Sequence, residues 1–247
     1  MDTITKQDII SGLKKIGIQP GMELEVHSSL KSFGYVEGGA ITVINALKET
    51  IGSNGSIFMP SLRLSPRLPL SQTDKNLGIT CKIKLLSPDE EHSAMGLIAD
   101  TFRKMPDVLT GDGIFRVSAW GKNSDKVSQG FQYLLDKGGK ALLLGVDIYR
   151  LTAMHYVEDL LPQKVRDIFK PSEKVNKIYP PEKWFIEAGE APIKAWYTIQ
   201  KMALDQGYIK EGQIGNCKCM FFDLWDIVGM YQYELKTNPY RLYGIEQ

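Results

Sequence analysis

The sequence predicts an α/β protein built in layers, and three observations support this class. The first sixty residues carry hydrophobic patterns typical of helix, strand, helix and strand, in that order. The run ALLLGV at 141–146 is continuously apolar, as expected for a strand buried on both faces of a sheet. With 247 residues, of which 43% are hydrophobic and 24% charged, the chain is long enough to bury a large core.

The first helix is expected over residues 5–16, where Thr5 and Asp8 resemble a capping box with Asp in place of Glu. Gly17 ends this helix. Its apolar stripe consists of Ile9, Ile10, Leu13 and Ile16. A strand follows over 22–27, because every second residue there is apolar.

The segment after this strand, HSSLKSFGYVEGG at 27–39, is polar and glycine-rich and opens into a second helix. The buried stripe of that helix is Ile44, Leu47 and Ile51, and Gly52 ends it. A short apolar strand over 56–59 then stops at Pro60.

Two stretches of the remaining chain lack a regular period. Residues 62–90 contain Pro66, Pro69 and Pro88, and residues 163–195 are rich in Lys, Glu and Pro. Around them we expect a helix from Ser93 to Met105, a strand over 114–120, helices over 127–137, 152–161 and 197–206, and an aromatic helical tail from 223. We read the stripe Phe221, Phe222, Trp225, Tyr231 and Tyr233 of that tail as core. We therefore predict a single domain, 1–247, with irregular insertions at about 62–90 and 163–195.

Charge and composition exclude several function classes. The 30 Lys and Arg against 29 Asp and Glu leave a net charge of +1, which argues against nucleic acid as a partner. No apolar run is long enough to cross a membrane, and MDTITKQDII does not resemble a secretory signal. The three cysteines, Cys81, Cys217 and Cys219, suggest a reducing compartment, so we expect a cytoplasmic protein without a bound metal.

The junction 27–39 is the first candidate site. Backbone N–H groups at a strand-to-helix junction can bind a phosphate or a polar cofactor arm, because the first N–H groups of a helix lack internal partners. Ser28 and Ser29 add hydroxyl donors and Lys31 adds charge. From these residues alone, an ordinary connection between strand and helix explains the pattern equally well.

The second candidate site is TAMHYVED, which follows the buried strand. Thr152, His155 and Glu158 are spaced by three and would share one face of a helix. An imidazole paired with a carboxylate is the arrangement of an oriented general base. On spacing alone, a structural histidine beside a solvated glutamate is the more frequent explanation. His27 and His92 are read as a core or hinge residue and a solvated residue, and no GxSxG elbow is present.

Several segments, in order along the chain, resemble the aminoglycoside 3-N-acetyltransferase family of the non-GNAT type. They are VHSSLKSFGYVEGGAITVINALKETIGSNGSIFMPS, SAMGLIADTFRKMPDV, VSAWG, LLLGV with TAMHYVED, and GQIGNCKCMFFDLWDIV. Together they cover about three quarters of the chain; the stretches 62–90 and 163–195 match poorly. The order of the motifs makes this resemblance more specific than any one motif.

The resemblance implies an α/β/α sandwich with a smaller mixed antiparallel and helical subdomain. It also implies acetyl transfer from acetyl-CoA to an amino group of an amino sugar, with an aminoglycoside-type acceptor. His155 would accept the proton of the amine, Glu158 would orient it or share that role, and Thr152 would contact the substrate or the thioester. The family's CoA-facing loop corresponds to Ser28, Ser29, Leu30, Ser32, Phe33 and Gly34.

One segment departs from the family pattern. The family usually shows Arg-Ser-x-His-Pro where this chain has Leu109, Thr110, Gly111, Asp112 and Gly113. A histidine and an arginine are lost there and a carboxylate appears, so we assign Asp112 to acceptor binding. The change favours, slightly, a broader class of amino sugars. A nucleotide-linked amino sugar of surface-glycan synthesis is the alternative acceptor, and a non-catalytic CoA-binding protein is the alternative of another class.

Overall fold

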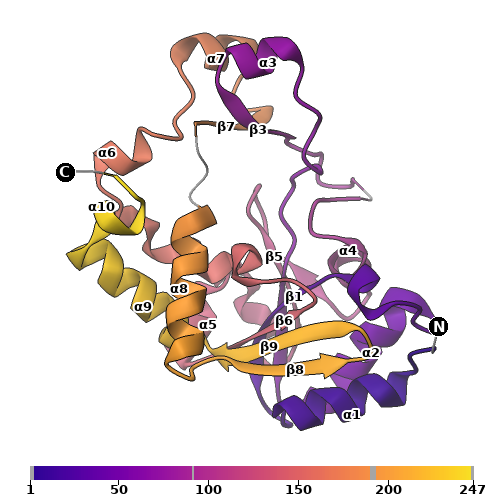
Figure 1. Cartoon of the computed structure of the whole chain (residues 1–247). Helices are drawn as coiled ribbons and strands as arrows, with labels where there is room; N and C mark the ends of the chain where they lie inside the picture. The colour runs from indigo at the N-terminus through magenta and orange to yellow at the C-terminus, as the bar shows by residue number, and fades with distance from the viewer. Residues whose placement is uncertain (1–2, 91, 190–192, 246–247) are drawn as a thin grey trace.

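The computed structural model describes residues 3–90, 92–189 and 193–245, and a mixed seven-stranded sheet forms its centre (Figure 1). The strand order is β4-β5-β2-β1-β6-β9-β8. The strands are β1 Glu23–Ser28, β2 Ser56–Pro60, β4 Leu109–Thr110, β5 Val117–Gly121, β6 Lys140–Leu144, β8 Lys210–Ile214 and β9 Cys217–Asp223. β1 pairs in parallel with β2 and β6, and the outer strands are antiparallel.

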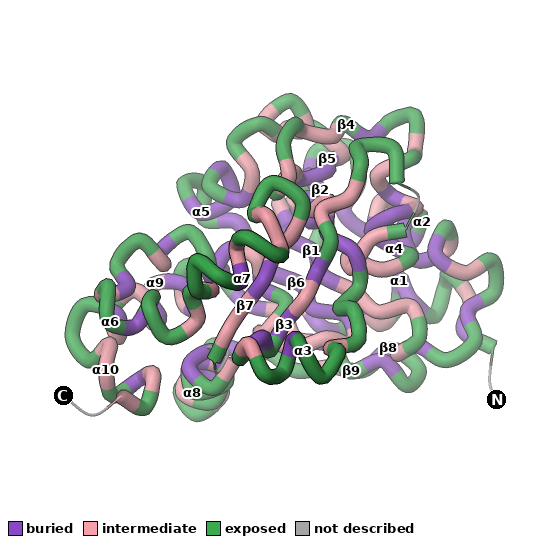
Figure 2. Tube along the Cα trace, turned by 90° about the horizontal axis from the view of Figure 1, so that it is seen from above, coloured by how far each residue is buried: buried purple, intermediate pink, exposed green. Residues whose placement is uncertain are grey.

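Helices cover both faces of this sheet, which confirms the α/β/α sandwich. One face carries α1 Lys6–Ile16, α2 Gly39–Ile51 and α4 Leu97–Arg103. The other carries α5 Gln132–Lys137, the 3₁₀ helix η4 Thr152–Leu160, α8 Ile193–Asp205 and α9 Leu224–Thr237. Side chains of the central strands alternate between the two cores, Leu24 and Val26 to the first and Phe58 to the second. Figure 2 shows these strands buried beneath exposed loops.

The remaining helices are short. They are the 3₁₀ helices η1 Leu30–Phe33, η2 Ser124–Gln129 and η3 Ile148–Arg150, and the α-helices α3 Gln72–Asn76, α6 Gln163–Arg166, α7 Glu173–Ile178 and α10 Pro239–Leu242. Among the described residues, no helix has the length and the apolar character that crossing a bilayer requires.

The local signals at α1 act as predicted. The backbone N–H of Asp8 donates to the Thr5 hydroxyl at 3.3 Å, and the N–H of Thr5 donates to the Asp8 carboxylate at 2.9 Å. Gly17 ends the helix with φ 112°, a conformation that favours glycine. All four residues of the predicted stripe are buried.

The two stretches expected to be irregular pair with each other. β3 Ile79–Lys84 and β7 Trp184–Ala188 form a two-stranded antiparallel sheet. Buried Asp74 of α3 joins them to α7, because it accepts from Lys82 Nζ at 2.6 Å and from the Tyr179 hydroxyl at 2.5 Å. These two hydrogen bonds hold the pKa of Asp74 far below its usual range. Sequence patterns missed this sheet because its strands are about a hundred residues apart in the chain.

Three predicted helices differ in detail from the structure. α4 begins at Leu97 instead of Ser93, because the Ser93 hydroxyl donates to Asp100 Oδ1 at 2.8 Å instead of capping a helix. The helix expected over 127–137 is divided at Gly130, whose φ is 60°. The helix expected over 152–161 is a 3₁₀ helix.

Figures 1 and 2 show the small sheet above one end of the strands of the large sheet. This is the end at which the parallel strands β1, β2 and β6 have their carboxyl termini. In α/β folds, ligands bind at the carboxyl ends of parallel strands.

Candidate functional site

Thr152, His155 and Glu158 lie in line along η4. A 3₁₀ helix has three residues per turn, so side chains spaced by three are eclipsed, and the alignment is closer than in an α-helix. His155 Nδ1 lies 2.6 Å from Glu158 Oε2. An ionised carboxylate only accepts, so Nδ1 carries the proton and Nε2 keeps a free lone pair. The His155 side chain is 60% exposed, and that lone pair is open to a substrate.

A second histidine–carboxylate pair lies beneath the start of η4. His27 Nε2 is 2.7 Å from Glu25 Oε1, and both side chains are buried in β1. The backbone N–H of Ala153 donates to Glu25 Oε1 at 3.1 Å, and that of Thr152 points to His27 Nε2 at 3.4 Å. The first N–H groups of a helix lack internal partners, so this buried pair anchors the helix that carries His155.

Aromatic residues of α8 and α9 hold the exposed pair in place. The Trp196 ring packs on the His155 ring, with centroids 4.9 Å apart. The buried Tyr231 hydroxyl donates to Glu158 Oε1 at 3.3 Å and lies 2.5 Å from the Tyr243 hydroxyl. Both carboxylate oxygens of Glu158 are therefore held, one by Tyr231 and one by His155.

The pKa of His155 is raised above its ordinary 6.5. Burial against the protein lowers this pKa, but the hydrogen bond and charge of Glu158 outweigh that effect, with smaller contributions from Glu187 and Glu25. A higher pKa makes the neutral imidazole a stronger base.

Glu187 belongs to the small sheet, and its charge acts on His155. It lies on β7, and one of its carboxylate oxygens, Oε2, is buried and without a hydrogen-bond partner among the described residues. Burial raises the pKa of Glu187, while the positive charges of Arg67 and His155 lower it. Arg67 donates to the hydroxyl of Tyr149, which follows β6. The charges of both Glu158 and Glu187 act to raise the pKa of His155.

Residues 27–34 form a tight turn at the carboxyl end of β1. Ser29 precedes η1, its backbone N–H donates to Leu144 O at 2.8 Å, and Ser32 Oγ donates to Ser29 O at 2.7 Å. Ser28, Leu30 and Gly34 lie at or near the surface. The Phe33 side chain is buried in the core, so only its backbone can face a ligand.

Asp112 lies in the loop between β4 and β5. It is exposed and lines a pocket with Arg116, Ser128 and Tyr156. Tyr156 follows His155 directly, but its hydroxyl accepts from the backbone N–H of Phe131 at 3.0 Å. The structure groups Thr152, His155 and Glu158 along η4, and Asp112 is not part of that row. Within 3–90, 92–189 and 193–245, no group of three His, Cys, Asp or Glu residues is arranged to hold a metal ion.

Sequence reasoning missed Glu25, Glu187, Trp196 and Tyr231. A glutamate on the alternating face of a predicted strand looks solvent-facing, yet Glu25 is fully buried. Its only sequence signal is its i, i+2 spacing to His27, which puts both on one side of a strand. Tyr231 belonged to the stripe expected to be core; it is buried, but Trp225 and Tyr233 of that stripe are 41% and 63% exposed.

Comparisons with known proteins agree with this architecture. The family model described as aminoglycoside 3-N-acetyltransferase matches residues 26–236. The chain is 30% identical over 258 residues to the SPbeta prophage-derived aminoglycoside N(3′)-acetyltransferase-like protein YokD of Bacillus subtilis, covering 91% of this chain and 89% of the relative. It is 28% identical to aminoglycoside N(3)-acetyltransferase III of Salmonella sp, covering 91% and 88%.

Solved structures share the fold. The apoenzyme of aminoglycoside acetyltransferase AAC(3)-IVa superposes with a TM-score of 0.71 at 21% identity, covering 98% of this chain and 92% of that one. The family model and the Bacillus subtilis relative both span nearly the whole α/β/α sandwich and the Thr152–Glu158 segment. The chain belongs to the aminoglycoside 3-N-acetyltransferase family.

Proposed function

We propose that this chain transfers the acetyl group of acetyl-CoA to an amino group of an amino sugar, with His155 as the base. It is an acyltransferase by family, and relatives that match most of its length are named aminoglycoside N-acetyltransferases. The residue assignment rests on the His155–Glu158 pair. The Glu158 carboxylate holds Nδ1 of the imidazole, and the His155 side chain is exposed.

In this reaction His155 Nε2 accepts the proton of the attacking amine while Glu158 stabilises the imidazolium that forms. The amine nitrogen bonds to the thioester carbonyl carbon, and the thiolate of CoA leaves when the tetrahedral intermediate collapses. Thr152, one turn before His155, is placed to contact the reacting groups. Backbone N–H groups are suited to stabilise the oxyanion of the intermediate.

Residues 28–34 supply a binding site for the polar arm of acetyl-CoA. The first N–H groups of η1, those of Leu30 and Lys31, have no acceptor within the helix, and Lys31 is exposed. Ser28, Ser29 and Ser32 add hydroxyl groups on the same turn. A related fold binds CoASH in the structure of AAC-IIIb, which supports the same use here.

The charges around His155 suit a cationic acceptor. Glu158 contacts the base and the charge of Glu187 acts on it, and an amine cation would satisfy a buried carboxylate oxygen such as Oε2 of Glu187. Structures of related fold contain a gentamicin and sisomicin. We infer that the acceptor is an aminoglycoside-type amino sugar and that Asp112 makes a further contact with it.

We further infer that residues 1–247 act as one acetyltransferase domain, because backbone hydrogen bonds join the small sheet to the segment after β2, among them Ser65 N–H to Lys84 O at 2.9 Å. The cysteines Cys81, Cys217 and Cys219 are free and buried, which supports a cytoplasmic location.

Thiol release from acetyl-CoA tests the proposed function. We expect turnover with aminoglycosides, and a several-fold lower kcat/KM for Glu187→Gln, since that variant keeps the shape and loses the charge. Asp112→Ala, in the loop between β4 and β5, is the control variant and should lower kcat/KM less than Glu187→Gln does. Failure of every aminoglycoside and nucleotide-linked amino sugar to release thiol, with acetyl-CoA bound, would favour a non-catalytic CoA-binding protein.

A further inference from the structure

Three arginines gather on the α4 face of the sheet, beside the carboxyl end of β2. The β2–β5 pairing continues past Pro60, because the backbone N–H of Ser61 donates to Arg116 O at 3.0 Å and that of Arg63 to Ile114 O at 2.8 Å. Side chains alternate along this extension. Met59 points into the core under α4, so Ser61 and Arg63 point to the same side.

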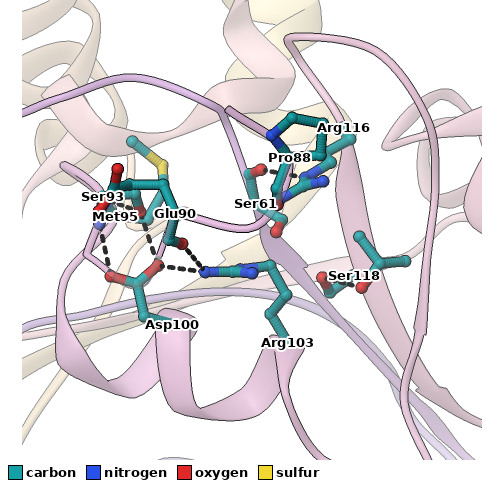
Figure 3. Close-up of polar contacts among 10 residues, drawn as sticks. Ser61, Pro88, Glu90, Ser93, Met95, Asp100, Arg103, Arg116 and Ser118 are labelled. Carbon is teal, nitrogen blue, oxygen red and sulfur yellow. Dashed lines mark hydrogen bonds and ion pairs between the residues drawn. The ribbon is translucent and has the colours of Figure 1, made fainter. Parts of the chain in front are cut away.

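Arg116 reaches this side from the opposite strand, and Arg103 reaches it from α4. On β5, Trp120 packs against the core under α4, so alternation places Ser118 and Arg116 on that face too. Figure 3 shows Ser61 between the side chains of Arg103 and Arg116. Ser118 lies nearby, with its hydroxyl 2.8 Å from that of Thr110.

Backbone carbonyls hold each guanidinium in place without neutralising it. Arg63 Nε donates to Leu86 O at 2.8 Å, and Arg103 Nη2 donates to Glu90 O at 2.7 Å. Arg116 donates through Nε to Ser61 O at 3.1 Å and through Nη2 to Pro88 O at 2.8 Å. A guanidinium has five N–H donors, so each arginine has donors left over.

Nearby carboxylates compensate this charge only in part. Asp100 lies 3.6 Å from Arg103, but its two oxygens accept from Ser93 Oγ and from the Ser93 backbone N–H, at 2.8 and 2.7 Å. Burial lowers the pKa of Arg116, and the positive charges of Arg103 and Arg63 lower it further, against smaller opposing effects of Asp89 and Asp100. Repulsion between partly buried cations is unfavourable unless an anion joins them.

The Ser61 hydroxyl is the second sign of a missing ligand. The residue is 5% exposed, and its Oγ has no hydrogen-bond partner among the described residues. A buried hydroxyl without a partner is costly, and such groups are uncommon in folded proteins.

We propose that Ser61, Arg63, Arg103 and Arg116 form a binding site for a phosphate group. Planar guanidinium forks match phosphate oxygens in charge and geometry, and a hydroxyl donor completes the set. Gly96, which precedes α4, lies near the Ser28 carbonyl, so α4 runs from the 27–34 turn to Arg103 of the site. This inference rests on the proposed function for its ligand, which is either a phosphate of CoA or the diphosphate of a nucleotide-linked amino sugar.

Calorimetric titration with inorganic pyrophosphate, CoA and uridine diphosphate tests the site. In Arg116→Gln we expect pyrophosphate affinity to fall about tenfold or more, the scale of losing charge-assisted hydrogen bonds. Arg116→Lys keeps the charge without the fork and should bind with intermediate affinity. Arg241→Gln, on exposed α10, is the matched control and should bind like the unaltered chain.

A fold control accompanies the titrations. Without ligand, the Tm of Arg116→Gln should equal or exceed that of the unaltered chain, because removing one of three like charges relieves repulsion. If Arg116→Gln does not fold, Arg103→Gln takes its place, with the same expected loss of affinity.

The outcomes separate the two ligand sources. A parallel loss of CoA affinity assigns the site to CoA, whereas a loss confined to uridine diphosphate and pyrophosphate assigns it to a nucleotide-linked acceptor. If the unaltered chain binds pyrophosphate through Arg116 but does not bind CoA, the phosphate site stands and the proposed function fails. Equal binding of all three probes by Arg116→Gln, or no binding of any by the unaltered chain, overturns the site.

Discussion

Two histidine–carboxylate pairs in this chain have nearly the same contact distance and opposite surroundings. His27 and Glu25 lie 2.7 Å apart with side chains 5% and 0% exposed. His155 and Glu158 lie 2.6 Å apart with side chains 60% and 23% exposed. The distance between the partners therefore does not define the role of such a pair. What distinguishes a base is a ring nitrogen that remains open to substrate.

Local structure explains the difference. On β1, residues spaced by two share a side, and that side of a central strand faces the core. Both buried side chains are therefore used internally: His27 pairs with Glu25, and Glu25 accepts from the backbone N–H of Ala153. On η4, residues spaced by three line the outer face, so His155 keeps Nε2 free. The buried pair positions the exposed one.

The largest expected effect belongs to the exposed pair. His155→Gln should lower kcat by about 10²-fold or more, because it removes the base, while acetyl-CoA affinity and Tm change little. Thiol release and calorimetry measure the two quantities. A variant with nearly unaltered kcat at neutral pH would show that His155 is structural and that the comparison is wrong.

The buried pair should respond in the opposite sense. Glu25→Ala should lower the free energy of unfolding by about 3 kcal/mol, the usual cost of leaving one partner of a buried pair alone. Denaturant titration measures this loss. The folded fraction should also turn over more slowly, since the Ala153 N–H loses its acceptor and η4 loses an anchor. If stability is unaffected, Glu25 does not hold η4.

The smallest effect concerns the pKa of His155. Glu158→Gln removes the main contribution that raises this pKa, so the acid limb of the kcat/KM–pH profile should move to lower pH. We expect a loss of about tenfold at the optimum, comparable with one charge-assisted hydrogen bond. Tyr231→Phe is the milder companion, because it keeps the carboxylate and loses one donor.

The raised pKa also has a consequence for stability. The folded pKa of His155 exceeds its unfolded value of 6.5, so the protonated form is favoured in the folded chain. This contribution to stability is fully present below the unfolded pKa and is lost as pH rises through the folded pKa. In Glu158→Gln the dependence of Tm on pH over this window should be weaker, and an unchanged dependence would contradict the assigned cause.

The sequence by itself determined the elements whose signals are local. The capping box at Thr5, the buried strand at 141–146 and the spacing of Thr152, His155 and Glu158 all depend on neighbours within a few residues, and the structure contains each of them. Family motifs extended this to the sandwich fold and to acetyl transfer.

The side chains around His155 could be identified only from the three-dimensional structure. Glu25 reaches Ala153 across 128 positions of sequence, and Tyr231 reaches Glu158 across 73. Glu187 is brought in by a sheet whose strands look irregular in isolation. The burial, charge and pairing of these groups depend on contacts between segments that are distant in the sequence. Hydrophobic spacing predicts which face of a helix or strand is buried, but it does not predict which other element covers that face.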